Sequence, residues 1–177
     1  MNRKTSDITK VALFAALTAM GAFISIPLGV VPITMQSLFV MLSGFLLGPS
    51  LGALSQAVYL ILGLMGLPLF ASMTGGIQTI FKPSFGFLLS FIAASFLSGF
   101  FTQKKKTFVS FIKASIISSL VMYLIGLPYM AFILNFYLDE GLTVIYILKI
   151  GFFAFIPSDI LKLILASILG YRLKDKV

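Results

Sequence analysis

The sequence contains neither cysteine nor histidine, and only 5 of its 177 residues are acidic. The absence of cysteine excludes disulfide bonds, thiolate metal sites and cysteine nucleophiles. The absence of histidine removes the commonest general base and metal ligand. No G-x-x-x-x-G-K-[ST] pattern is present, so this chain does not bind ATP by a P-loop. We therefore expect no metal, no cofactor and no enzymatic activity, and any ATP hydrolysis would belong to another subunit.

Charged residues of both signs are also scarce, because they make up 10% of the chain, whereas 59% of its residues are hydrophobic. The mean hydropathy is +1.11. Soluble domains carry about 25% charged residues. The apolar runs are too continuous for the strands of outer-membrane barrels, in which apolar and polar residues alternate. The sequence therefore predicts an all-α integral membrane protein, formed by one domain in a lipid bilayer.

Six apolar stretches predict a bundle of six transmembrane helices, separated by turns rich in proline and glycine. We expect Thr34 to cap the second helix and Pro128 to kink the fifth. The second helix is unusually short, and short membrane segments often flank the binding sites of transporters. We expect no cleavable signal peptide. The predicted spans cover residues of about 9–26, 35–47, 50–65, 83–101, 107–134 and 142–171.

The basic residues indicate how the helices are oriented. Six spans place both termini on one side, and most of the lysines and arginines fall on or near that side. By the positive-inside rule, both termini are cytoplasmic, and we expect a multi-pass protein of a bacterial cytoplasmic membrane. The net charge of +8 then requires no nucleic acid. The residues on this side are Arg3, Lys4, Lys10, Lys104–Lys106, Lys113, Arg172, Lys174 and Lys176.

An acid and a base lie three residues apart in the last span, just after Pro157. Positions i and i+3 share one helix face, so Asp159 and Lys162 point the same way. Counting back from Tyr171, Asp159 lies roughly 18 Å into the membrane, where an unpaired charge is costly. No second acid lies at this depth, which excludes a catalytic carboxylate pair. The two side chains either bind a small polar group with N–H donors and a carbonyl, or form only an ion pair with each other.

The longest irregular region runs from Gly66 to Lys82 and contains Thr74, Gly75, Gly76 and Gln78. It is too apolar for a solvated loop, so we expect it to fold back into the mouth of the bundle. Two adjacent glycines allow backbone conformations closed to other residues. They either turn main-chain N–H groups toward a ligand or form only a tight turn. The side chains expected to be buried here are Leu69, Phe70, Ile77, Ile80 and Phe81.

Two glutamines are polar residues within the short hairpin of the second and third spans. Gln36 lies near the start of the second span, and Gln56 lies within the third. A buried amide requires a hydrogen-bond partner. Each glutamine therefore either bonds to a neighbouring helix or contacts a ligand.

Small residues recur four apart in the first span. Ala12 pairs with Ala16, and Ala15 pairs with Ala19. Small residues at this spacing let a second helix approach closely. The pattern indicates either packing inside the bundle or the docking of a separate membrane subunit.

Four motifs occur in an order that is specific as a set, and by them the chain resembles the BioY family, the biotin-binding S components of energy-coupling-factor (ECF) transporters. At 82–87 the family's usual G-P-T-G-G-[YF] reads Lys-Pro-Ser-Phe-Gly-Phe, and Ser158 stands where glycine is common. The matching stretches are Val31-Pro32-Ile33-Thr34-Met35-Gln36, Leu47-Gly48-Pro49 with Leu51-Gly52-Ala53, Gly63 to Phe70, and Phe155 to Lys162.

The resemblance implies high-affinity capture of biotin near the extracellular face, for uptake driven by ATP on partner subunits. Asp159 would accept bonds from the ureido N–H groups, and Lys162 would either donate to the ureido carbonyl or orient Asp159. The implied partners are a transmembrane coupling subunit, docked on the alanine pattern of the first span, and two ATPase subunits. The other residues expected at the site are Gln36, Thr74, Gly75, Gly76, Gln78, Phe85, Phe87 and Tyr129.

Two other functions stay open at this point. One is a proton-coupled secondary carrier for a small carboxylate or a related vitamin, with Asp159 as the proton site. Lys162 stabilises the charged carboxylate, which disfavours that role. The other is a scaffold that transports nothing and recruits a partner through its alanine pattern.

Overall fold

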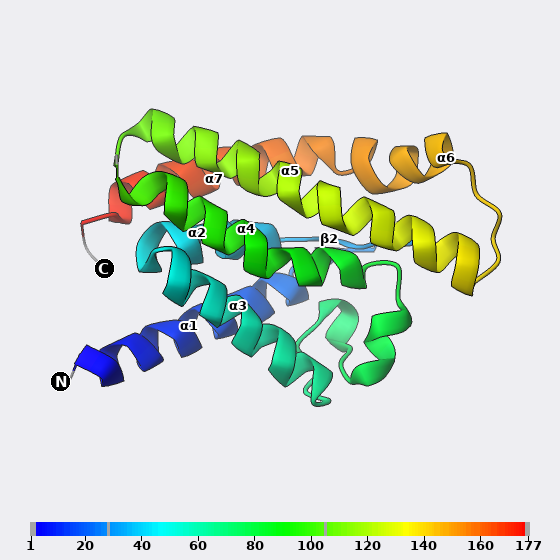
Figure 1. The fold of residues 1–177 in the computed structure, drawn as a ribbon, viewed down its shortest axis with the longest axis horizontal. Coiled ribbons are helices and arrows are strands. Elements are labelled where there is room, and N and C mark those ends of the chain that lie inside the picture. The colour runs from blue at the N-terminus through cyan, green and yellow to red at the C-terminus, as the bar shows by residue number, and fades with distance from the viewer. Residues whose placement is uncertain (1–2, 28, 105, 176–177) are drawn as a thin grey trace.

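The computed structural model describes residues 3–27, 29–104 and 106–175, and most of these residues are helical (Figure 1). The prediction of an all-α protein with six main helical segments is confirmed for this part of the chain. The elements in chain order are α1 (Arg3–Phe23), β1 (Ser25–Ile26), β2 (Ile33–Thr34), α2 (Gln36–Leu47), α3 (Pro49–Leu64), η1 (Ala71–Met73), η2 (Ile77–Phe81), α4 (Phe85–Gln103), α5 (Phe108–Phe132), η3 (Ile133–Tyr137), α6 (Val144–Leu148), η4 (Lys149–Phe153) and α7 (Ile156–Leu173).

Length and composition separate the helices into two groups. Helices α2 and α3 have 12 and 16 residues and are apolar. At 1.5 Å per residue they are about 18 and 24 Å long, shorter than a hydrocarbon core of about 30 Å. The stretches that are long and apolar enough to cross a membrane alone are Lys4–Phe23, Phe85–Gln103, Phe108–Tyr137 and Val144–Leu173.

Helix α1 begins earlier and ends earlier than the sequence predicts. It starts at Arg3 instead of near residue 9, because no proline or glycine interrupts the polar head. It ends at Phe23, where the chain enters an antiparallel hairpin that pairs β1 with β2. Thr34 belongs to this hairpin, and the N-cap of α2 is Met35. The prediction of Thr34 as the cap is therefore wrong by one residue, although its hydroxyl still accepts a bond from the Gln36 N–H at 3.4 Å.

Helix α4 lies at the centre of the bundle and packs against α2, α3 and α5. Small residues allow this close packing. A side chain on Gly44 of α2 would lie 2.1 Å from the carbonyl oxygen of Ser95 on α4. Gln56 is fully buried here, and its amide donates to Ser43 at 3.1 Å. Of the two alternatives that the sequence leaves open for Gln56, ligand contact and a hydrogen bond to a neighbouring helix, the structure shows the hydrogen bond.

The region between α3 and α4 folds back against the bundle as two 3₁₀ turns, η1 and η2. Phe70 is its anchor, because its side chain is 2% exposed and packs against Tyr59 with 5.6 Å between ring centroids. Leu69 and Ile80 pack against the same core while partly buried. Ile77 and Phe81 are exposed, contrary to expectation. The region is anchored by a few apolar contacts and leaves these two side chains on the outer surface.

Proline affects the last two segments in different ways. Helix α5 continues through Pro128 to Phe132, where the π-helical turn η3 follows. The predicted single helix over 142–171 is instead three pieces, α6, the π-helical η4 and α7, with a turn at 154–155. Pro157 has no N–H to continue a helix from the preceding turn. The new helix α7 therefore starts here, and Asp159 lies in its first turn.

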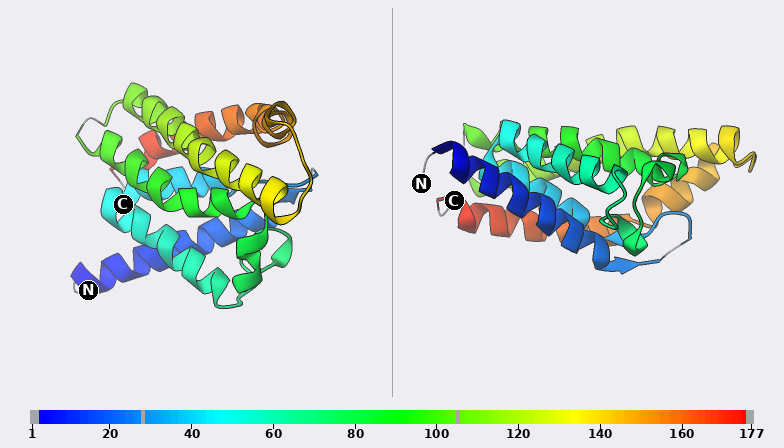
Figure 2. Two further views of the ribbon diagram at one scale, coloured as in Figure 1. Left: turned by 45° about the vertical axis from the view of Figure 1, so that its right-hand side comes forward. Right: turned by 90° about the horizontal axis from the view of Figure 1, so that it is seen from below.

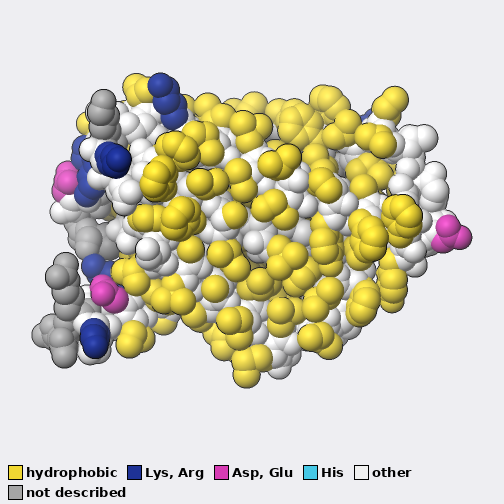
Figure 3. Space-filling view, viewed as in Figure 1, with side chains coloured by type: hydrophobic (Ala, Val, Ile, Leu, Met, Phe, Trp, Pro, Cys, Tyr) yellow, Lys and Arg dark blue, Asp and Glu magenta, His cyan; other side chains and the backbone are white. Residues whose placement is uncertain are grey.

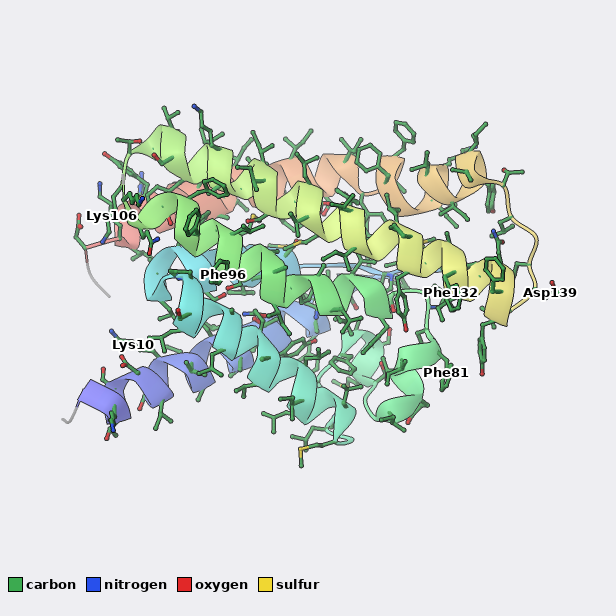
Figure 4. All side chains as sticks on the ribbon, in the orientation of Figure 1. Lys10, Phe81, Phe96, Lys106, Phe132 and Asp139 are labelled. Carbon is green, nitrogen blue, oxygen red and sulfur yellow. The ribbon has the colours of Figure 1, made fainter. Side chains whose placement is uncertain are left out.

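On the face shown in Figure 3, the exposed charged side chains lie near the two ends of the bundle. The start of α1 and the end of α7 lie at the same end (Figures 1 and 2). Lysine and arginine side chains cluster there, and the surface between the ends is mainly hydrophobic (Figure 3). Lys10 and Lys106 lie at this end and Asp139 at the other (Figure 4). Lys105 and Lys176, which the sequence places on the basic side, are outside the described residues.

Candidate binding cavity

A cavity of about 310 Å³ lies between the β-hairpin, the segment 70–84 and helices α2, α4, α5 and α7. Small-molecule sites have volumes of about 300–1,000 Å³ and combine apolar walls with a few polar groups. The polar residues that line it are Thr34, Gln36, Ser37, Ser72, Thr74, Thr79, Lys82, Ser84, Ser119, Tyr123, Asp159 and Lys162. The larger apolar residues are Val30, Val31, Met41, Phe70, Phe87, Leu88, Phe91, Met122 and Phe155.

Asp159 and Lys162 face this cavity as an ion pair, with 2.5 Å between Lys162 Nζ and Asp159 Oδ1. Lys162 is 3% exposed. The first turn of α7 favours the carboxylate, because the positive end of a helix dipole stabilises a negative charge. Together the two groups offer hydrogen-bond acceptors and donors to one polar ligand. No group of His, Cys, Asp or Glu able to hold a metal occurs in the described part of the chain.

Two residues far away in the sequence complete the surroundings of the pair. The Tyr123 hydroxyl, on α5, donates a hydrogen bond to Asp159 Oδ2. Lys162 Nζ donates to the main-chain carbonyl of Thr34 at 3.2 Å. Both carboxylate oxygens and the ammonium group are therefore partnered. A ligand that binds the pair has to replace or share these bonds.

A chain of hydrogen bonds continues from Thr34 to the segment after α3. The Thr34 hydroxyl donates to the Gln36 amide oxygen at 2.9 Å. The Gln36 amide nitrogen donates to the Tyr59 hydroxyl at 2.6 Å. Tyr59 in turn donates to the carbonyl of Leu69 at 3.2 Å. This chain connects the ion pair and the β-hairpin to Leu69, the residue directly before the 70–84 segment.

Aromatic rings form an apolar wall next to the ion pair. The rings of Phe87 and Phe155 stack at 6.4 Å between centroids, and Phe87 meets Tyr123 edge-on at 6.3 Å. Phe152 also meets Tyr123 edge-on, at 4.8 Å between centroids. This packing fixes the ring of Tyr123 so that its hydroxyl reaches Asp159. The wall is suited to an apolar ligand body beside the polar pair.

The structure brings together five of the ten residues that the sequence indicates for the site. Asp159, Lys162, Gln36, Thr74 and Phe87 all line the cavity. They come from four different elements or segments, α7, α2, the 70–84 segment and α4. The hydroxyl of Thr74 donates to the carbonyl of Ala71 at 3.0 Å, which fixes the turn at η1.

The other five residues lie outside the cavity lining. The Gly76 N–H donates to the carbonyl of Gly63 at 2.7 Å, so it holds the loop against the end of α3. The Gln78 amide donates to the Gly75 carbonyl at 2.6 Å on the exposed side. Phe85 is part of the core around Phe70. The remaining residue, Tyr129, donates its hydroxyl to the Ile80 carbonyl at 2.5 Å and holds η2 against α5.

Several cavity residues are absent from the sequence-based set. Tyr123 is the clearest, and its only signal is a hydroxyl inside an apolar span, where a buried tyrosine needs a partner. Lys82 appears in the sequence only as a replacement for glycine in a family motif. Ser37 and Thr79 have buried hydroxyls without a hydrogen-bond partner among the described residues. Nothing in their sequence neighbourhoods marks them.

The alanine pattern of α1 is divided between two environments. Ala15 and Ala19 are buried in the core with Tyr59 and Phe91. Ala12 and Ala16 are exposed on the outer face of α1. The first pair therefore packs inside the bundle, and only the second is accessible to another subunit.

A comparison with models of known protein families identifies the family of this chain. The model of the BioY family matches residues 1–177. The chain belongs to the BioY family. It is 39% identical over 168 residues to the biotin transporter BioY of Thermotoga maritima, covering 95% of each chain. It is 40% identical over 171 residues to the probable biotin transporter BioY of Pyrococcus horikoshii, covering 97% of this chain and 98% of the relative.

A solved structure has the same fold. The crystal structure of the S-component for biotin from an ECF-type ABC transporter superimposes with a TM-score of 0.76 and 30% sequence identity. The match covers 98% of this chain and 93% of that chain. The chain therefore shares the fold of this S-component over nearly its whole length.

Proposed function

We propose that this protein captures biotin from outside the cell and is the substrate-binding subunit of an ATP-driven biotin transporter. Its relatives are named as biotin transporters, and its structural neighbour is the S-component for biotin of such a system. The observation that carries the proposal is the buried ion pair of Asp159 and Lys162, which faces a cavity of about 310 Å³. The chain is a binding and transport protein and not an enzyme.

The ion pair recognises the ureido ring of biotin. Asp159 accepts hydrogen bonds from the ureido N–H groups, and Lys162 donates to the ureido carbonyl. The bonds that these side chains make to Tyr123 and Thr34 hold them in place before the ligand enters. Charge-assisted hydrogen bonds of this kind are about twice as strong as neutral ones. The stacked rings of Phe87 and Phe155 contact the apolar part of biotin.

The charges at the ends of the bundle support an orientation in the membrane. Lys10 and Lys106 lie at the end where α1 begins and α7 ends, and Asp139 lies at the opposite end. By the positive-inside rule, the basic end faces the cytoplasm of the bacterium. The six helical segments then cross the cytoplasmic membrane, with α2 and α3 as the two short ones. The β-hairpin and the 70–84 segment cover the cavity from the extracellular side.

Energy for uptake comes from other subunits, because the sequence has no P-loop. A transmembrane coupling subunit carrying two ATPase subunits docks on the outer face of α1. Ala12 and Ala16 are exposed there, four residues apart, and permit close approach of a partner helix.

Equilibrium binding of labelled biotin to the purified chain in detergent tests the site. The variant is Asp159→Asn, and its matched control is Asp139→Asn, which changes an exposed acid at the far end of the bundle. Removing one partner of a buried ion pair costs about 3–5 kcal/mol, so we expect affinity to fall by more than about 100-fold. The control keeps wild-type affinity. Tight biotin binding by a folded Asp159→Asn variant would show that the site lies elsewhere.

A further inference from the structure

The charged residues that line the cavity do not balance. Asp159 and Lys162 neutralise each other as an ion pair. Lys82 is the third charged residue in the lining, and no carboxylate in the described part of the chain forms an ion pair with it. The described lining therefore carries a net charge of +1. A cavity with this charge favours a ligand that carries one negative charge.

The main chain fixes Lys82 at the edge of this cavity. Its N–H donates to the Thr79 carbonyl at 3.0 Å, and its carbonyl accepts from the Phe85 N–H at 3.0 Å. Pro83 follows directly and keeps Lys82 extended, at φ −85° and ψ 139°. Lys82 is partly buried between the end of η2 and the start of α4. Its position is therefore set by two elements that also form the wall of the cavity.

Two hydroxyl residues and a helix end lie beside Lys82. Thr79 lines the cavity, is 2% exposed, and its hydroxyl has no hydrogen-bond partner among the described residues. Ser84 also lines the cavity and is the N-cap of α4, with no side-chain capping bond. The N-terminal end of α4, a helix of 19 residues, adds partial positive charge. These groups are hydrogen-bond donors of the kind that bind a carboxylate.

We infer that Lys82, Thr79 and Ser84 form an anion subsite for the carboxylate of the transported ligand. This inference rests on the proposed function, because the same cavity holds both ends of the ligand. The Asp159–Lys162 pair binds the neutral, hydrogen-bonding head, and the aromatic wall contacts the apolar middle. The ligand class is a monoanion with a polar head and an apolar linker. Biotin, with its ureido ring and valerate chain, belongs to this class.

The test separates the charge of the ligand from its shape. Equilibrium binding is measured for biotin and for its primary amide, which replaces the carboxylate with a neutral group of similar size. The proteins are the wild type, Lys82→Met, Lys82→Arg and the control Lys149→Met. Lys149 is exposed in η4 and does not line the cavity. All are purified as the full chain in detergent and checked for monodispersity.

The subsite predicts a specific pattern of affinities. The wild type binds biotin at least about tenfold more tightly than the amide, which corresponds to about 1.4 kcal/mol. Lys82→Met removes this preference by weakening biotin binding, and it leaves the amide within about threefold of its wild-type affinity. Lys82→Arg restores at least part of the preference, and Lys149→Met keeps all of it.

Two results would overturn the subsite. One is a wild type that binds the amide as tightly as biotin, a comparison that needs no variant and so does not depend on folding. The other is a Lys82→Met variant that keeps the wild-type preference for biotin over the amide. Unchanged affinity for both ligands is expected if Lys82 only reaches toward lipid headgroups at the membrane surface, and an equal loss of both would show an effect that does not depend on the carboxylate. A folded wild type that bound neither ligand would contradict the proposed function itself.

Discussion

The ammonium group of Lys162, on α7, donates a hydrogen bond to the main-chain carbonyl of Thr34, in the β-hairpin, across 3.2 Å and 128 residues of sequence. The same ammonium group is paired with Asp159 at 2.5 Å. One buried cation thus connects the ion pair in the cavity to the hairpin that covers it. A ligand that draws the ammonium group toward itself acts on the hairpin as well.

Replacing Lys162 with methionine therefore removes two interactions together. We expect biotin affinity to fall by more than about 100-fold, because breaking a buried ion pair costs about 3–5 kcal/mol. We also expect a lower melting temperature without ligand, since Asp159 and the Thr34 carbonyl lose a buried partner. Titration calorimetry and thermal unfolding in detergent measure the two effects. Unchanged affinity in the variant would contradict the role of Lys162 in the site.

Replacing Tyr123 with phenylalanine removes only the hydroxyl that bonds to Asp159. The ring still packs against Phe87 and Phe152, so we expect the fold to be kept. A hydrogen bond to a charged group contributes about 1.5–3 kcal/mol, and we expect biotin binding to weaken by roughly 10- to 150-fold. Tyr146→Phe, at an exposed position of α6, is the matched control. Equal affinities of the two variants would mean that Tyr123 does not position Asp159 for binding.

The sequence makes part of this site predictable. The spacing of Asp159 and Lys162, two positions that lie three residues apart on one helix face, identifies a pair without any knowledge of the fold. Their partners Tyr123 and Thr34 are 36 and 128 residues away, and only the packing of α5 and the hairpin against α7 brings them close. The local spacing therefore predicts the pair, whereas the hydrogen-bond partners of the pair can be identified only from the tertiary structure.

The glycines show a different limit of sequence reading. The pattern at Gly75 and Gly76 indicates a special backbone conformation, and Gly76 indeed has a φ of +90°. It does not indicate where the N–H groups point, and that of Gly76 points to the Gly63 carbonyl. The break before α7 shows the same limit of sequence-based prediction. Pro157 marks an interruption, but the sequence does not show that the helix restarts with Asp159 in its first turn.

Replacing an alanine of α1 with leucine should affect partner binding at the exposed pair and stability at the buried pair. Ala16→Leu changes the exposed face, so we expect the isolated chain to bind biotin normally and to lose co-purification with its coupling subunit. Ala19→Leu overfills the core, which costs about 1–3 kcal/mol, and should lower the melting temperature of the isolated chain. Co-purification from cells and thermal unfolding separate the two variants. If Ala16→Leu kept its partner, the coupling subunit would not dock on this face of α1.

The close contact between α2 and α4 predicts that a larger residue at Gly44, away from the cavity, lowers the stability of the protein. A methyl group on Gly44 would lie 2.0 Å from Ser98 Oγ and 2.1 Å from the Ser95 carbonyl oxygen. Gly44→Ala therefore forces the two helices apart, and we expect a loss of about 1–3 kcal/mol. Ser50→Ala, at an exposed position of α3, serves as the control. Thermal unfolding without ligand measures the change, and equal melting temperatures would show that the helices separate at no cost.

The most direct measurement is the structure of this protein with biotin bound. We predict that the ureido carbonyl lies within about 2.7–3.2 Å of Lys162 Nζ, and that a ureido nitrogen lies at a similar distance from the Asp159 carboxylate. A complex in which biotin bound elsewhere, and Asp159 and Lys162 contacted only each other, would contradict the proposal that this ion pair is the recognition site.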